Sequence, residues 1–409
     1  MNRRLFFIWT GILICALILV YYQWTPVIAA QQIQLDQDAT QTTEIFSLAS
    51  EYHDNIPDLR TLTQSADKDV SDILDDPYAV YYTPEELKSF TDFLEGDFGD
   101  SYVSTITYEL LEGSTGYIRI SSFGRHTPEE FSAAITELQS KGTKNLILDL
   151  RDNGGGYVDS AMKILSNFIA DDVLTIIVNQ QGEYHAMRAP PQTPSSLPLL
   201  ELPIVVLVNN NSASASELLA GALQDYSLAT LVGEPTYGKG SVQRIIPLSS
   251  GGALKMTVSK YLTPLGRDIE QNGLTPDHFI QTPALQQEVA WQILHPETKP
   301  ILTLNISSGQ AVLNNREFTS PWPLFKTSSN VLMPLRQVLE AMQYQVFWQQ
   351  GRINIYSGKE LVWSVQPDAN AASEIIVKYG VSYLTEHALS QLNIDVYREN
   401  NKITLTRLK

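Results

Sequence analysis

PIVVLVNNNSASASELLAGALQD, residues 203–225, joins an apolar run, a polar turn and a helix-forming segment. The run at residues 203–208 is rich in β-branched side chains and does not alternate with polar ones, which predicts a strand buried on both faces. Three asparagines at 209–211 interrupt the run. Good helix formers follow at helical spacing. The chain is therefore predicted to pass from strand to tight turn to helix, with three serines at the turn.

A serine at such a turn is exposed at the end of a sheet, where it can act as a nucleophile. The free N–H groups at the start of the following helix point toward it and can stabilise an oxyanion. The small side chains of Ala213 and Ala215 leave room for a peptide carbonyl. Acyl transfer to a serine is thus the chemistry that this segment favours.

A serine hydroxyl needs a base, and a second segment offers one. Residues 233–243 read GEPTYGKGSVQ and place Lys239 between two glycines. A lysine acts as a base only when it is neutral, so burial must bring its pKa well below the usual value. Gln243, on the same side of a strand, can orient the amine without favouring its charged form.

Each of these features also has a plainer interpretation. A serine before a helix is usually an N-cap, and a Gly-Lys-Gly run is usually a surface turn. Three serines compete for the role of nucleophile, namely Ser212, Ser214 and Ser216. Their spacing alone does not distinguish them.

Together the two segments resemble the carboxyl-terminal processing peptidases, the tail-specific serine proteases. That family carries a Ser-Ala-Ser-Ala-x-Glu turn, a helix ending near Gln-Asp, and the pattern Gly-Glu-x-Thr-x-Gly-Lys-Gly-x-Val-Gln, all present here. The resemblance places the nucleophile on Ser214 and the base on Lys239. It places the amide that completes a Ser-Lys-Gln arrangement on Gln243.

A glycine loop follows another apolar run, since residues 145–156 read NLILDLRDNGGG. A glycine loop at a helix start is an anion nest, but no Gly-Lys-Ser/Thr accompanies it as in a phosphate-binding loop. In the family this loop supplies the second oxyanion donor, which falls on Gly155, with Gly154 and Gly156 left open. The first donor falls on the N–H of Ala215. Asp149 and Arg151 are expected to form an internal ion pair that shapes the loop.

The composition limits the partners. The chain has 409 residues, 43% hydrophobic and 18% charged, which suits a globular protein of two or three domains. Its formal net charge of -17 argues against nucleic acid or an anionic membrane surface as a partner. Six scattered histidines with no paired spacing predict no metal site and no cofactor. Cys15 lies in an apolar segment, where it is neither a disulfide partner within the chain nor a nucleophile.

The N-terminus predicts export. Two arginines precede the uncharged, mostly apolar residues 5–22, which are long enough to cross a bilayer. The arginines would stay inside and send the rest of the chain outside, while the small residues near Ala29 offer a cleavage site. We therefore expect a signal anchor or signal peptide over 1–30, a tether and N-terminal helical region over 31–100, and an extracytoplasmic location in either case.

Strand and helix alternate from residue 116 to 280, which predicts an α/β core over 101–297. The resemblance implies a core of the crotonase/ClpP-like type. Most family members insert a PDZ domain near the position of residues 99–100, whereas here strand-like residues follow at once. The PDZ domain is thus expected to be missing, which leaves tail selection in doubt but not hydrolysis.

Residues 298–409 form a different module with an internal repeat. The pattern of residues 331–355 recurs 50 residues later, at 381–405, and each copy predicts a helix followed by a two-strand hairpin. The first copy resembles the stalk-like domain named after the N-terminal domain of copper amine oxidases, with its Pro-Leu-Arg-x-x-x-Glu-Ala pattern; the second is degenerate. No copper ligands are present. The small α+β module is expected to be a spacer, or alternatively to bind the cell wall or a protein partner.

These observations predict an extracytoplasmic serine endopeptidase that hydrolyses proteins or peptides through a Ser-Lys dyad and an acyl-enzyme. Its other predicted contact is with the membrane, through the N-terminal helix. The alternative is a non-catalytic cell-envelope scaffold that keeps the protease fold as a binding platform. A thioester hydrolase on the same core is a more distant third.

Overall fold

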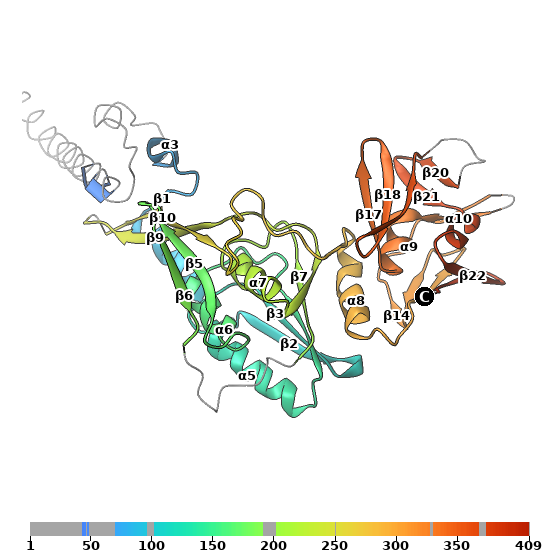
Figure 1. The fold of residues 1–409 in the computed structure, drawn as a ribbon, viewed down its shortest axis with the longest axis horizontal. Helices are drawn as coiled ribbons and strands as arrows, with labels where there is room; N and C mark the ends of the chain where they lie inside the picture. Colours follow the sequence, from blue (N-terminus) through green and yellow to red (C-terminus); the bar gives the residue numbers. More distant parts are fainter. Residues whose placement is uncertain are drawn as a thin grey trace, which may run out of the picture. The chain divides into compact units, whose positions relative to one another are not determined.

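The computed structural model describes residues 43–45, 47–48, 70–95, 102–190, 202–249, 251–327, 330–367 and 374–408 (Figure 1). The chain divides into two compact units. The first unit takes its residues from Met1–Thr91, Asn179–Glu183 and Val242–Lys260. The second takes Asp92–Val178, Tyr184–Ser241 and Tyr261–Lys409. Both the predicted nucleophile and the predicted base belong to the second unit.

The second unit is a mixed α/β structure centred on a six-stranded sheet. In spatial order the strands are β11 (His278–Phe279), β8 (Ala229–Gly233), β7 (Ile204–Val208), β4 (Asn145–Asp149), β3 (Thr115–Ile120) and β2 (Ile106–Leu111). The strands from β11 to β3 run parallel, and only the edge strand β2 is antiparallel to its neighbour. The carboxyl ends of β4, β7 and β8 therefore meet at one edge of the sheet.

The predicted buried strand at 203–208 is confirmed as β7, whose five residues are all buried. Val205 and Leu207 belong to one apolar cluster with side chains of α8 (Pro283–Leu294). Because alternate side chains of a strand point to opposite faces, Val206 faces the other side of the sheet. Burial on both faces is what an apolar run without alternation requires.

The remaining helices of the core form a row. They are α5 (Thr127–Ser140), α6 (Val158–Leu165) and α7 (Ala215–Asp225). Each contacts the next, and α5 and α7 also contact strands of the central sheet. The short helix η1 (Glu112–Ser114) joins β2 to β3, and an antiparallel hairpin is made by β5 (Val173–Asn179) and β6 (Tyr184–Arg188).

The first unit is built on an antiparallel strand pair. Its elements are α3 (Val70–Leu74), β1 (Val80–Tyr82), β9 (Ser241–Pro247) and β10 (Ala253–Leu262), and α4 (Pro84–Glu95) follows β1. Both β1 and β9 pair with β10. Leu74, Ala79, Leu248, Leu254 and Met256 form its apolar core. No helix among the described residues is long and apolar enough to span a bilayer, and the predicted anchor at 5–22 lies outside them.

The C-terminal segment, residues 298–408, contains three small sheets. The first has the order β14 (Arg316–Glu317), β13 (Ala311–Leu313), β12 (Ile301–Asn305), β23 (Lys402–Arg407) and β22 (Ile394–Glu399). The second has β15 (Phe325–Lys326), β16 (Val331–Pro334), β21 (Val381–Leu384) and β20 (Ile375–Lys378), and the third has β17 (Tyr344–Gln349), β18 (Arg352–Ser357) and β19 (Glu360–Val365). Its helices are α9 (Leu335–Ala341) and α10 (Glu386–Ser390).

The repeat in the sequence is a repeat in the structure, with one correction. The elements β16, α9, β17 and β18 recur as β21, α10, β22 and β23. Each copy opens with a strand, so the expectation that a helix begins at Val331 is wrong. Met333 and Pro334 pair with the matching strand of the other copy, and the whole of β16 is buried. The strand pairing between the copies overrides the local helical pattern. The helix α9 therefore begins only after Pro334.

The C-terminal segment packs directly on the core of the second unit. One apolar cluster runs from Val205 and Leu207 of the central sheet through Val289 of α8 to Leu335 and Leu339 of α9. Apolar burial is the main favourable term in folding. The segment and the central sheet therefore share one hydrophobic core.

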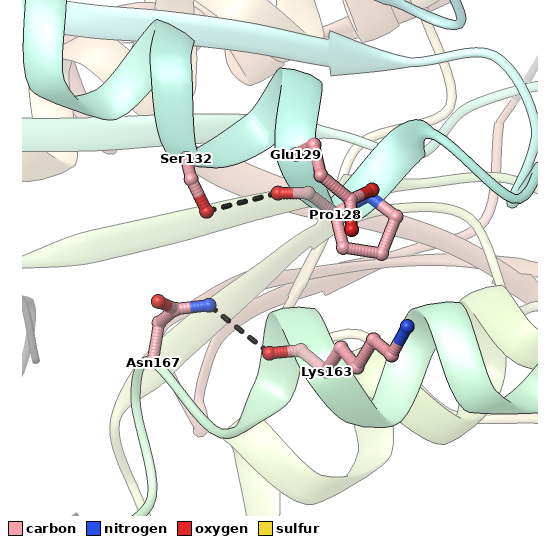
Figure 2. Close-up of a pocket in the computed structure, with 5 residues that line it drawn as sticks. All are labelled: Pro128, Glu129, Ser132, Lys163 and Asn167. Atoms are coloured by element: carbon pink, nitrogen blue, oxygen red, sulfur yellow. Dashed lines mark hydrogen bonds between the residues drawn. The ribbon is translucent and has the colours of Figure 1, made fainter.

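A hollow of about 410 Å³ lies between α5 and α6 (Figure 2). Two of its polar side chains are bonded to the backbone of their own helix region. Ser132 Oγ donates to the Pro128 carbonyl at 2.9 Å, and Asn167 Nδ2 donates to the Lys163 carbonyl at 3.1 Å. The hollow contains none of the predicted site residues.

Candidate active site

Ser214 immediately precedes α7, at the turn that follows β7. Its backbone has φ 56° and ψ -115°, a conformation that a non-glycine residue adopts only at a cost of roughly 1–3 kcal/mol. A strained strand-to-helix turn is the usual position of a nucleophilic serine. The predicted sequence of strand, turn and helix is confirmed here.

The surroundings of the three serines differ. Ser212 and Ser216 are fully buried. Ser212 Oγ donates to the Leu150 carbonyl and Ser216 Oγ to the Asn153 carbonyl, each at 2.8 Å. Ser214 is partly exposed. Two of the hydroxyls thus hold the backbone together, and only the middle serine of the three is open to solvent.

A buried carboxylate joins the serine turn to the lysine loop. Glu217 is fully buried, and its Oε2 accepts the backbone N–H of both Ser214 and Lys239, each at 2.9 Å. Its Oε1 accepts the Gly238 N–H at 2.7 Å and the Thr236 hydroxyl at 2.5 Å. Four donors offset the cost of burying the charge. The Ser214 and Lys239 backbones consequently meet at one oxygen atom.

Tyr261 makes a second bridge between the same two residues. Its hydroxyl lies 2.8 Å from the Ser214 carbonyl oxygen and 2.9 Å from that of Lys239. The ring is buried, and its backbone N–H donates to the Gly240 carbonyl at 2.8 Å. The single hydroxyl hydrogen is therefore held between two carbonyl groups, one from each loop.

The glycine loop packs against the serine turn. A Cβ added to Gly155 would lie 2.8 Å from the Ala213 carbonyl oxygen and 3.1 Å from the Ala215 nitrogen. Gly155 has φ 102°, a conformation that side chains strongly disfavour. Its N–H, a predicted oxyanion donor, donates to Asn153 Oδ1 at 2.8 Å in this structure. Gly154 is exposed, and a Cβ there would meet nothing within 4 Å.

Asn153 connects the glycine loop to β3 and to the serine turn by hydrogen bonds. It is fully buried, and its Nδ2 donates to the Ile120 carbonyl at 2.9 Å. Its own carbonyl accepts the Ala213 N–H at 3.0 Å in addition to the Ser216 hydroxyl. Asn153 therefore sets the distance between the glycine loop and the serine turn.

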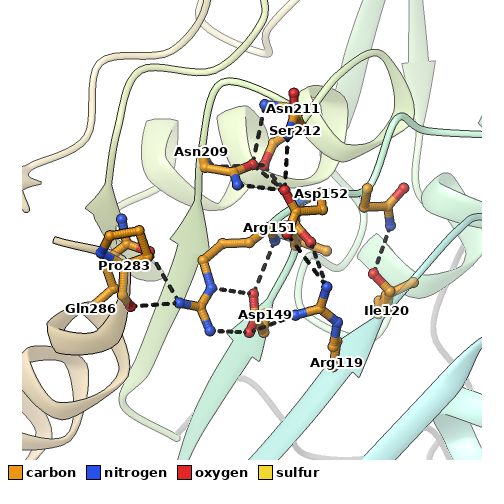
Figure 3. Close-up of polar contacts among 12 residues, drawn as sticks. Arg119, Ile120, Asp149, Arg151, Asp152, Asn209, Asn211, Ser212, Pro283 and Gln286 are labelled. Carbon is orange, nitrogen blue, oxygen red and sulfur yellow. Dashed lines mark hydrogen bonds and ion pairs between the residues drawn. The ribbon is translucent and has the colours of Figure 1, made fainter. Parts of the chain in front are cut away.

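The predicted ion pair at the base of the glycine loop is confirmed (Figure 3). Arg151 binds the fully buried Asp149 in a bidentate manner, with Nε 2.9 Å from Oδ1 and Nη2 2.6 Å from Oδ2. The Tyr117 hydroxyl donates to Asp149 Oδ2 at 2.6 Å. Burial, together with the nearby Asp149 charge, raises the pKa of Tyr117 to about 12. The tyrosine therefore remains a donor at neutral pH.

The tip of the loop is pinned to the serine turn by side-chain amides. Asp152 Oδ1 accepts Nδ2 of Asn209 at 2.8 Å and Nδ2 of Asn211 at 2.9 Å (Figure 3). These bonds, that of Asn211 above all, hold the pKa of Asp152 below its usual value. Asparagines that first read only as strand breakers thus connect the two loops.

Gln243 belongs to the first unit, within β9. Its Nε2 donates to the Tyr78 carbonyl at 2.9 Å. It also lines a hollow of about 490 Å³ with Arg244, Val258 and Asn179. Since the lysine belongs to the second unit, the orienting role of Gln243 stays a prediction.

The sequence interpretation missed Glu217, Tyr261 and Asn153. A signal existed for Glu217, because a glutamate three residues after a serine at a helix start has the spacing of a capping box. Asn153 stands beside the loop glycines, but no pattern shows that its side chain turns inward. Nothing local distinguishes Tyr261, which contacts the site from 47 residues away in the chain.

Residues 114–280 match peptidase family S41. These residues, called the S41 region below because of this match, make up about two fifths of the chain. S41 peptidases are serine peptidases, and this match includes the serine turn, the lysine loop and the glycine loop.

The curated relatives of the S41 region are processing proteases. The "Carboxyl-terminal-processing protease" of Synechocystis sp. is 41% identical over 172 residues, which cover 42% of this chain and 39% of the relative. The "Carboxy-terminal processing protease CtpB" of Bacillus subtilis (strain 168) is 33% identical over 205 residues, covering 50% of this chain and 42% of the relative. The chain thus matches about two fifths of the length of these relatives.

One solved structure resembles a larger part of the chain. A lipoprotein from Streptococcus agalactiae superposes with a TM-score of 0.50 at 16% identity, covering 63% of this chain and 96% of that one. A similarity at this identity concerns the fold alone. The S41 region and its sequence relatives therefore carry the functional argument.

Gly155→Ala is expected to lower kcat/KM for peptide cleavage by roughly 10²-fold if the predicted site is the active one, because the added methyl group collides with the serine turn and displaces the N–H groups predicted to bind the oxyanion. Gly154→Ala is the matched control, since its Cβ enters open space. Cleavage of a fluorogenic peptide by the two variants checks the prediction. Equal activity of both would contradict it.

Proposed function

We propose that this chain is an extracytoplasmic serine endopeptidase of the carboxyl-terminal processing type. Ser214 is the nucleophile, Lys239 the general base and Gln243 the group that orients the amine. The family match of residues 114–280 supports hydrolysis of peptide bonds. The substrates are proteins or peptides.

One observation carries the proposal. The N–H groups of Ser214 and Lys239 are bound by the same oxygen of the buried Glu217. Two residues 25 positions apart in the sequence are thereby fixed side by side, as a nucleophile and its base must be. The buried carboxylate therefore supports the proposal by holding the backbones of the proposed nucleophile and base together.

The mechanism follows from the proposed roles. The neutral amine of Lys239 takes the proton from Ser214 Oγ as that oxygen attacks the peptide carbonyl. The N–H groups of Ala215 and Gly155 stabilise the oxyanion. Protonated Lys239 gives this proton to the leaving amine and becomes neutral again, and an ester between Ser214 and the substrate remains. Lys239 then activates a water molecule, which hydrolyses the ester and restores the serine.

The Gly155 N–H must exchange its hydrogen-bond acceptor before it can bind the oxyanion. The Gly155 N–H is bound to Asn153 Oδ1 in this structure. An oxyanion, being charged, is a stronger acceptor than an amide oxygen. We propose that the developing charge takes over this N–H, and that the exposed Gly154 leaves room for the substrate at the same place.

The setting of the enzyme completes the proposal. We place the core in the crotonase/ClpP-like class. We propose that the PDZ domain that most family members insert near residues 99–100 is missing, because α4 ends at Glu95 and β2 already begins at Ile106. Residues 5–22 anchor the chain, or direct its export before cleavage near Ala29. The C-terminal segment is a stalk-like module, as its Pro-Leu-Arg-x-x-x-Glu-Ala pattern suggests.

Covalent labelling tests the function. The full chain is incubated with a fluorophosphonate, from which an activated serine oxygen displaces fluoride, and the modified residue is located by mass spectrometry. We expect the label on Ser214, together with cleavage of unfolded casein that the label abolishes. A label on another residue would move the nucleophile, and no label with no cleavage would favour the scaffold.

A further inference from the structure

We infer that Glu340 of the C-terminal segment is a positioning residue for the active site, acting on the glycine loop through α8 and Arg151. The inference rests on the proposed peptidase function. It gives the C-terminal segment a part in catalysis that neither a spacer nor a partner-binding module would have.

The contact begins at the start of α8. Glu340 is fully buried, and its Oε1 and Oε2 accept the backbone N–H groups of Gln281 and Thr282, each at 3.0 Å. These N–H groups lie at the N-terminus of a twelve-residue helix, where a negative charge is favourable. Arg336 Nη1, 3.2 Å from Oε1, compensates the buried charge. A side chain of the C-terminal segment thus fixes the two residues that lead into α8.

The first turn of α8 in turn holds Arg151 (Figure 3). Arg151 Nη1 donates to the Pro283 carbonyl and to Gln286 Oε1, each at 3.1 Å. Gln286 is itself buried, and its Nε2 donates to the Ile280 carbonyl at 2.8 Å. The guanidinium group therefore has fixed acceptors on the α8 side.

Arg151 transmits this position to the glycine loop. Its Nε and Nη2 bind the buried Asp149, so the planar group is held from two sides. Arg151 begins the run of residues that leads to Gly155. A rotation of α8 would pull the guanidinium group away from Asp149 and shift the loop that carries an oxyanion donor.

A second connection reaches the lysine loop. Gln345 Oε1 of β17 accepts the Phe279 N–H at 2.9 Å, and the Ile280 N–H donates to the Gly233 carbonyl at 2.9 Å. Gly233 ends β8, and the chain runs from there to Lys239. Burial, and then the negative charge of Glu340, raises the pKa of Glu234 at the start of this loop. The C-terminal segment thus touches the supports of both catalytic loops.

The test compares Glu340→Gln with wild type. The amide has nearly the same shape, but its NH₂ group opposes a backbone N–H that the carboxylate accepted. We expect kcat to fall about 10-fold or more with KM changed less than about twofold, because misplaced oxyanion donors weaken the transition state more than substrate binding. Rates are measured at a temperature where circular dichroism shows both proteins folded.

Arg407→Gln is the matched control for stability. Arg407 lies in the same segment and donates to the Met342 carbonyl and to Ser357 Oγ, each at 2.7 Å. We expect this variant to lose thermal stability comparably while keeping kcat. An equal loss of kcat in both variants would overturn the inference, since any loosening of the segment would then suffice.

A double-mutant cycle tests the path itself. If Glu340→Gln folds poorly, Gln286→Ala alone serves, and it is expected to lower kcat with KM changed less than about twofold. Gln286→Ala removes a fixed acceptor of Arg151 without touching Glu340. If both residues act through Arg151, the double variant loses much less than the product of the two single losses in kcat/KM. Losses that multiply would overturn the path.

Labelling separates this inference from the proposed function. Wild type that neither reacts with the fluorophosphonate nor cleaves casein refutes the peptidase proposal. Wild type that does both, beside a Glu340→Gln variant labelled at the same rate, refutes only the positioning role.

Discussion

Ser214→Ala is expected to lower kcat/KM for peptide cleavage by at least ~10⁴-fold, because no other group can form the ester with the substrate. The fold should persist. Ser214 is partly exposed, and its N–H and C=O groups make the bonds to Glu217 and Tyr261. Thermal unfolding followed by circular dichroism checks this, beside the rate with a fluorogenic peptide.

The neighbouring serines are the controls for this prediction. Ser212→Ala and Ser216→Ala each remove one buried hydrogen bond, worth about 1 kcal/mol, and should retain most of the activity. Lys239→Ala should match Ser214→Ala, and the double variant should lose no more than either, since nucleophile and base act as one unit. Substantial cleavage by Ser214→Ala would reassign the nucleophile.

Patterns within short stretches of the sequence predicted the buried strand β7 and the ion pair at the glycine loop. An apolar run without alternation indicates burial on both faces wherever the neighbours come from, and β7 is such a strand. The Asp149–Arg151 pair was predictable for the same reason, because the two residues lie two positions apart at the end of one buried strand. The three catalytic candidates came from a motif, which carries chemistry but no distances.

What sequence could not supply are the contacts that join distant segments. Tyr261 reaches both Ser214 and Lys239, and Glu217 reaches Lys239, through bonds whose partners lie far apart in the chain, so no short window of sequence contains them. At Val331 a distant contact changes the secondary structure that the local pattern predicts. That pattern reads as helix, but pairing with the second repeat makes the segment a strand.

Glu217→Gln is expected to lower both the stability of the fold and the rate of peptide cleavage. The glutamine keeps one acceptor oxygen, while its NH₂ group faces N–H or O–H donors that the carboxylate satisfied. One donor is left unpaired if the NH₂ group faces Gly238 and the Thr236 hydroxyl, which can turn to accept, and two if it faces the N–H groups of Ser214 and Lys239, at about 1–3 kcal/mol each. We therefore expect the free energy of unfolding in urea to fall by about 1–6 kcal/mol.

The loss of activity should exceed what instability explains. If the amide faces Ser214 and Lys239, their backbones separate, and a shift of about 1 Å between nucleophile and base costs roughly 10²-fold in rate. Glu288→Gln is the control, a buried glutamate of α8 held by Asn314 and Arg316, whose pKa burial already raises. Because its side chain bonds to Asn314 and Arg316 rather than to the serine turn or the lysine loop, Glu288→Gln should change kcat little. A Glu217→Gln enzyme that is destabilised but fully active when folded would mean that the shared carboxylate supports the fold alone, and that the lysine reaches the serine without it.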